Sequence, residues 1–97
     1  MIIHVRGALM FHQLLGDQQP VHLEVPEGAT IVEVLQLLAG TSGASFGRLV
    51  FEAGTDDKVK SGISFVVNGF SHWNLAGQLN HRLTEGDELL LPMLTGG

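Results

Sequence analysis

Apolar and polar residues alternate in two segments near the start of the chain, which is the pattern of strands with one buried face. In the first segment the apolar parity holds Ile3, Val5, Leu9 and Phe11, and the other parity holds His4, Arg6, Met10 and His12. In the second segment, Val21, Leu23 and Val25 alternate with His22 and Glu24, up to Pro26-Glu27-Gly28. Residues 16–20 are typical of a turn, so we expect a β-hairpin.

A helix is predicted to follow this hairpin. Thr30 and Glu33 have the spacing of a capping box, in which each side chain accepts a hydrogen bond from the backbone N–H of the other residue. Gly40 is the expected end of the helix, because glycine readily adopts the left-handed conformation found there. Between these limits, apolar residues recur at helical spacing, at Ile31, Val34, Leu35 and Leu38. This stripe requires a sheet to pack against.

The middle of the chain has the weakest pattern. Residues 41–62 contain four glycines and the polar run 55–58, so we expect an irregular connection around a short apolar patch at 49–51. Residues 63–67 are apolar except for Ser64, which predicts a central strand buried on both faces. Asn68-Gly69 then predicts a tight hairpin turn.

The last part of the chain predicts further strands and a tail. Residues 70–75 can form a short return strand, 84–87 a turn and 88–91 the last strand. Residues 92–97 are expected to be a free, flexible tail that ends in Gly-Gly. The predicted fold class is therefore α+β. We expect a β-grasp domain over residues 1–91, with a mixed four- to five-stranded sheet and one main helix packed across it.

Composition and charge narrow the class of protein. A chain of 97 residues fits one domain, and 44% hydrophobic against 15% charged residues favours a globular fold over disorder. The net charge of −5 disfavours binding to nucleic acid or anionic membranes. We expect a cytoplasmic protein, because no segment has the pattern of a membrane span or a signal peptide. The absence of cysteine excludes disulfides, thiolate metal sites and thiol nucleophiles.

Four short segments, in order along the chain, carry a family resemblance. They are Pro26-Glu27-Gly28-Ala29-Thr30, Val66-Val67-Asn68-Gly69, residues 83–89 and Leu91-Pro92-Met93-Leu94-Thr95-Gly96-Gly97. Together they resemble the MoaD/ThiS family of ubiquitin-like sulfur carriers, most closely its molybdopterin synthase small-subunit branch, and they are also similar to the small archaeal modifier proteins. The thiamine branch lacks most of a connection like residues 41–62. The chain departs from the family at Leu91, where an aromatic residue is common, and at Met93, where a second proline is common.

The resemblance implies that the working group is the terminal carboxylate of Gly97. This carboxylate is ionised at neutral pH and can attack the α-phosphate of ATP. The resulting glycyl adenylate can react with a sulfur donor, which displaces AMP and leaves a thiocarboxylate (1-thioglycine). Gly96 keeps the approach to the reacting carbon free of side chains. The expected partner contacts are Leu91, Pro92, Met93, Leu94 and Thr95 along the tail, together with Phe70.

The resemblance also implies two partner proteins. The chain lacks a P-loop motif for ATP, so activation requires a ubiquitin-activating-like adenylyltransferase of the MoeB/ThiF type that uses ATP. A molybdopterin synthase large subunit of the MoaE type would then use the sulfur for molybdenum cofactor biosynthesis. The chain is expected to be a co-substrate or non-catalytic subunit, with no bound cofactor and no metal.

Three alternatives remain open at this point. The C-terminus can instead be joined to target-protein lysines through an isopeptide bond, as in a ubiquitin-like modifier. The sulfur can serve thiamine synthesis or tRNA thiolation rather than molybdopterin. The chain can also be a β-grasp binding module whose tail is inert, in which case removal of Gly96 and Gly97 would change nothing.

Other chemical signals are weaker. Residues 43–47 match the Gly-x-Ser-x-Gly motif of hydrolases, but that motif requires a strand before the serine, and a helix is predicted there instead. The five histidines lack metal-site spacing, although His4 and His12 share one strand parity, and we expect them on solvent-exposed faces. Lys58 and Lys60, the only lysines, are expected in a solvated loop.

The aromatic residues near the Asn-Gly turn have two possible roles. We expect Phe65 to lie in the core. Phe70 and Trp73 follow the turn and are equally consistent with core positions and with partner contacts. Their exposure decides between these roles.

Overall fold

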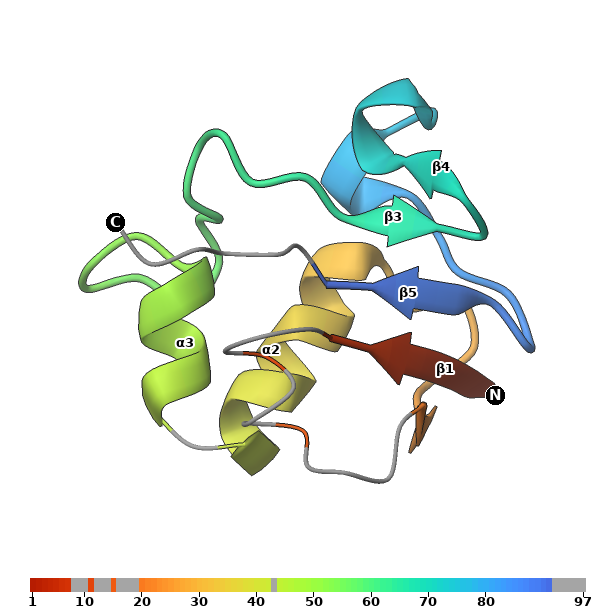
Figure 1. Ribbon diagram of the computed structural model, residues 1–97, viewed down its shortest axis with the longest axis horizontal. Helices are drawn as coiled ribbons and strands as arrows, with labels where there is room; N and C mark the ends of the chain where they lie inside the picture. Colours follow the sequence, from red (N-terminus) through yellow and green to blue (C-terminus); the bar gives the residue numbers. More distant parts are fainter. Residues whose placement is uncertain (8–10, 12–14, 16–19, 43, 92–97) are drawn as a thin grey trace.

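The computed structural model describes residues 1–7, 11, 15, 20–42 and 44–91 of the chain (Figure 1). Its strands are β1 (Ile2–Arg6), β2 (Val21–Glu24), β3 (Val66–Val67), β4 (Phe70–Ser71) and β5 (Glu88–Leu90). Its helices are α2 (Ile31–Ser42) and α3 (Ala44–Val50), with the 3₁₀ turns η1 (His72–Asn74) and η2 (Gln78–Asn80). No helix in these residues has the length and apolar character needed to cross a membrane.

The five strands form one mixed sheet in the order β2-β1-β5-β3-β4. Strands β1 and β5 are parallel neighbours, and the other three pairs are antiparallel. Both β1 and β5 run toward the end of the sheet where α3 lies (Figure 1). A mixed five-stranded sheet with a main helix is the predicted β-grasp arrangement, so the predicted fold class is confirmed.

Helix α2 contributes the predicted apolar stripe to the core. Its four stripe residues are each no more than 2% exposed, and they cluster with Ile3, Val5, Phe65, Val67 and Leu89 of the sheet region. The capping box is also confirmed, because Thr30 N–H donates to Glu33 Oε1 (2.9 Å) and Glu33 N–H donates to Thr30 Oγ1 (3.3 Å). Hydrogen bonds from the Thr30 backbone and hydroxyl lower the pKa of the Glu33 carboxyl.

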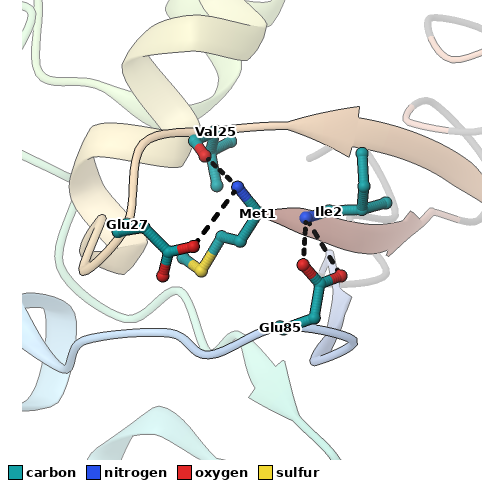
Figure 2. Close-up of polar contacts among 5 residues, drawn as sticks. All are labelled: Met1, Ile2, Val25, Glu27 and Glu85. Carbon is teal, nitrogen blue, oxygen red and sulfur yellow. Dashed lines mark hydrogen bonds and ion pairs between the residues drawn. The ribbon is translucent and has the colours of Figure 1, made fainter.

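The start of β1 is held from two sides, as Figure 2 shows. The Met1 amino group donates to the Val25 carbonyl (2.8 Å) and lies 3.9 Å from a carboxylate oxygen of Glu27. On the other side, Ile2 N–H lies 3.1 Å from both carboxylate oxygens of Glu85. The end of β2 and the turn before β5 therefore both anchor the first residues of β1.

The first strand is shorter than the alternation predicts. It ends at Arg6, and Phe11 and Leu15 have helical conformation, so the prediction of a strand through Phe11 is wrong. Phe11 and Leu15 are four residues apart, which places them on one face of a helix. Phe11 is buried, and its ring centroid lies 5.5 Å from that of Phe46. An alternation of apolar and polar residues this short does not distinguish a strand from a helix. Leu9, Met10, His12 and residues 16–19 of the turn predicted at 16–20 lie outside the described residues.

Two helical features were missed between residues 40 and 50. Helix α2 continues through Gly40 to Ser42, so the predicted end is two residues early. Helix α3 occupies part of the segment predicted to be irregular, which is a second error. Phe46 and Val50 are both fully buried at a spacing of four, so packing against the core outweighs the cost of Gly47 in a helix.

The predicted central strand at 63–67 is also corrected. Only Val66–Val67 form strand β3, and burial alternates, with Ile63, Phe65 and Val67 inside and Ser64 exposed. This strand therefore has one buried face, and the middle position of the sheet belongs to β5. The return strand is similarly short, because β4 ends at Ser71, whose hydroxyl accepts from Trp73 N–H (3.3 Å) and caps the turn η1.

Candidate functional site

The candidate site begins where the central strand β5 ends. β5 is paired on both sides, with Leu89 opposite Val5 of β1 and opposite Val67 of β3. After the strand, Leu91 N–H donates to the Arg6 carbonyl (2.8 Å), and the Leu91 side chain is only 2% exposed. The chain is thus held firmly up to Leu91, at the middle of the sheet, and residues 92–97 continue from this fixed point.

The turn that precedes β5 is stabilised by a group of hydrogen bonds around Asp87. Its carboxylate accepts from Thr84 N–H (2.8 Å), from the Thr84 hydroxyl (3.1 Å) and from the Asn68 amide (2.9 Å). Partial burial acts to raise the pKa of Asp87, but these hydrogen bonds outweigh it and hold the pKa below its usual value. The predicted turn at 84–87 is confirmed, with Gly86 at a φ of 83°.

Asn68 links this turn to the Asn-Gly hairpin. Asn68 and Gly69 have φ angles of 51° and 88°, as a tight hairpin turn requires, so the predicted turn is confirmed. The Asn68 side-chain oxygen also accepts from Glu88 N–H (2.9 Å). Residues 66–69 and 83–89, two of the segments that carry the family resemblance, are therefore in direct contact and together fix the start of β5.

The structure divides the predicted partner contacts into three groups. Leu91 is a core residue, only 2% exposed, so its side chain offers little surface to a partner, and its role as a partner contact stays a prediction. Phe70 is 64% exposed and Trp73 is 49% exposed, whereas Phe65 is fully buried as predicted. Pro92, Met93, Leu94, Thr95, Gly96 and Gly97 lie outside the described residues, and their roles remain predictions.

The predicted solvent exposure of His72 is wrong. His72 is 1% exposed, although all five histidines were expected on solvent-exposed faces. The His72 ring Nδ1 accepts a hydrogen bond from the backbone N–H of Phe65 (2.9 Å), and the backbone N–H of His72 donates to the Phe65 carbonyl (2.7 Å). Burial lowers the pKa of His72, and the hydrogen bond to Nδ1 requires the neutral ring. A hairpin centred on residues 68 and 69 places residue 72 opposite residue 65, so this signal was present in the sequence.

The weaker chemical signals do not assemble into a catalytic site. Ser45 is exposed on α3, and in the described part of the chain the element before it is helix α2 rather than a strand, so the hydrolase motif lacks its required context. Among the described residues, no group of three or more metal-binding side chains comes together. Lys60 donates to the Arg48 carbonyl (2.6 Å), while Lys58 is exposed.

Comparison with known proteins gives matches at the level of structure. No family model matches the chain, and no curated protein matches its sequence. SAMP1 from Haloferax volcanii is similar over 100% of both chains, with 24% identity and a TM-score of 0.74. Urm1 from Trypanosoma brucei is 25% identical over 99% of this chain and 95% of its own, also with a TM-score of 0.74.

A third similar structure is the putative molybdopterin converting factor, subunit 1, from Pyrococcus furiosus. It is 23% identical over 96% of this chain and 99% of its own, with a TM-score of 0.65. Coverage is nearly complete in all three cases, so the likeness concerns the whole domain rather than one motif. It agrees with the resemblance found in the sequence, and the chain has the ubiquitin-like β-grasp fold of these proteins.

Proposed function

We propose that this protein is a sulfur carrier whose working group is the carboxylate of Gly97. The observation that carries the proposal is the position of β5, which is the central strand of the sheet and leads directly into residues 92–97. Six extended residues span about 20 Å, at roughly 3.3–3.6 Å each. A tail of this length reaches into an enclosed active site of a partner while the folded domain stays outside.

The proposed chemistry takes place in two steps on the partner. A carboxylate oxygen of Gly97 attacks the α-phosphate of ATP, pyrophosphate leaves, and an acyl adenylate forms. A sulfur nucleophile then attacks the carbonyl carbon, AMP leaves with the shared oxygen, and a thiocarboxylate remains. Gly96 and Gly97 suit a narrow, dry site, because they place no side chain beside the reacting carbon.

The partners follow from what the chain lacks and what it exposes. The sequence has no P-loop, so an adenylyltransferase of the MoeB/ThiF type would bind the ATP. A synthase subunit of the MoaE type would accept the sulfur for molybdopterin. Phe70, in the outer strand β4, and Trp73, in the following turn η1, are exposed aromatic residues, and such residues favour protein contacts.

A ubiquitin-like modifier is the second candidate function. It is supported by the likeness to a small archaeal modifier protein from Methanosarcina acetivorans, with a TM-score of 0.75 and 22% identity. The activation step is the same, but a lysine amine of a target protein attacks the activated carbonyl in place of sulfur. Delivery of sulfur for thiamine synthesis or tRNA thiolation would differ only in the final acceptor.

The test is intact mass after incubation with an activating enzyme, ATP and a sulfide source. We expect a shift equal to the exchange of one oxygen for sulfur, and no shift in a variant lacking Gly97. Glu24→Gln is the matched control, because Glu24 is exposed on β2, at the sheet edge opposite β4, and its substitution leaves both the tail and Phe70 unchanged. No shift with a competent enzyme would overturn the carrier proposal, and lysine adducts in cell extract would favour the modifier.

A further inference from the structure

Two histidines face each other on the antiparallel neighbours β1 and β2. His4 and His22 are directly opposite in the antiparallel register. Their ring centroids lie 4.6 Å apart with the planes at 76°. In the sequence, His4 shares its strand parity with His12, but in the fold the histidine opposite His4 is His22.

The surroundings leave this pair accessible. Ile3 and Val5, on either side of His4, are fully buried, so His4 projects from the opposite, open face of the sheet. His4 is partly exposed and His22, on the outer strand β2, is exposed. Within the described part of the chain, neither ring has a hydrogen bond or an ion pair, so both imidazoles are free to take up a ligand.

We propose that His4 and His22 together bind one divalent transition-metal ion. Side chains directly opposite on antiparallel strands have Cβ atoms about 4.5–5.5 Å apart, close enough for two imidazole nitrogens to reach one ion. The neutral imidazole is the commonest metal ligand in proteins. The rings meet edge to face, so binding of a shared ion requires the two side chains to rotate until one nitrogen of each ring points at the ion.

The chemistry of the pair indicates which ion binds best. Because no third ligand group joins the two histidines among the described residues, water completes the coordination and the ion is exchangeable. Glu88 lies beside His4 in the neighbouring strand, but its carboxylate pairs with Arg6 Nε at 3.4 Å. Affinity for such a nitrogen site follows the order in which Cu²⁺ exceeds Ni²⁺ and Zn²⁺. The site is therefore expected to prefer Cu²⁺.

Calorimetric titration with Cu²⁺ in a non-chelating buffer tests the proposal. We expect one ion per chain for the natural protein, with weaker binding of Zn²⁺. Loss of either imidazole removes the chelate, so H4Q and H22Q should each weaken binding by about tenfold or more. H81Q is the matched control, because it removes a histidine outside the pair and should leave the affinity unchanged.

Two further measurements decide ambiguous cases. Thermal melting without metal shows whether each variant still folds. H22Q is expected to have little effect on the core, because His22 is exposed on the outer strand β2. A Zn²⁺ titration followed by NMR should shift the ring signals of His4 and His22 together. Binding of Cu²⁺ by folded H22Q as tightly as by the natural protein, or no binding by the natural protein, would overturn the proposal.

Discussion

Acidification should destabilise the fold through His72, whose ring is almost fully buried. Burial in the folded state lowers the pKa of His72, while the pKa of a histidine in the unfolded chain is about 6.5. Below that pH the unfolded chain binds a proton that the folded chain resists, so stability falls as the pH falls toward the folded pKa. Above about pH 6.5 both states are neutral, and His72 contributes no pH dependence.

The size of the effect follows from this difference in proton binding. Each pH unit between the unfolded and the folded pKa lowers the free energy of unfolding by about 1.4 kcal/mol. In a domain of this size, about 1 kcal/mol corresponds to a change of about 4–8 °C in Tm. The structural cause is visible at Phe65, because a protonated Nδ1 cannot accept the 2.9 Å hydrogen bond from Phe65 N–H.

Urea unfolding at pH 7.5, 6.5 and 5.5 measures the effect, with Trp73 as the fluorescent reporter because its ring lies 4.4 Å from His72. The comparison protein is His72→Asn, whose side-chain oxygen keeps an acceptor near Nδ1 but does not titrate. All other ionisable groups are shared, so they cancel in the difference between the two proteins. The advantage of the natural protein over His72→Asn should shrink as the pH falls. Parallel pH profiles would refute the assignment of His72 as the responsible group.

Three further predictions concern other parts of the fold. Thr30→Ala removes the helix cap and should lower the free energy of unfolding in urea by about 1 kcal/mol, whereas Thr30→Ser should retain most of it. Asn68→Ala removes the hydrogen bonds to Asp87 and Glu88 and should cost about 1–3 kcal/mol by the same assay; an unchanged midpoint would contradict the role given to Asn68. Phe70→Ser should change stability by no more than about 0.5 kcal/mol. In the assay with an activating enzyme it should raise KM without lowering kcat, and an unchanged KM would exclude Phe70 from the partner surface.

Local signals with a specific chemical cause were read correctly from the sequence. The capping box at Thr30 and the left-handed turn at Asn68 each depend on residues close together in the chain, so the pattern contains the information. Helix α3 was missed because Gly47 within it and Gly43 just before it argue for a loop, while its stability comes from burying Phe46 and Val50 against distant elements.

The candidate site was predictable in part. The segments that fix the start of β5 were recognised from their order, but the burial of Leu91 and His72 depends on which strands become neighbours. Pairing of His4 with His22 likewise depends on the exact hairpin register. Such register is decided by the whole sheet, and a one-residue change would send each side chain to the other face.

The parallel pair of β1 and β5 also governs how the molecule responds to mechanical tension. Force applied between Ile2 and Leu91 pulls the two strands along their length in opposite directions. The bonds across the register His4–Glu88, Val5–Leu89 and Arg6–Leu90 are then loaded together in shear, rather than opened one after another as in a peeled hairpin. A machine that pulls on the segment after Leu91 while the start of the chain is held therefore has to break these contacts together before the two strands can separate.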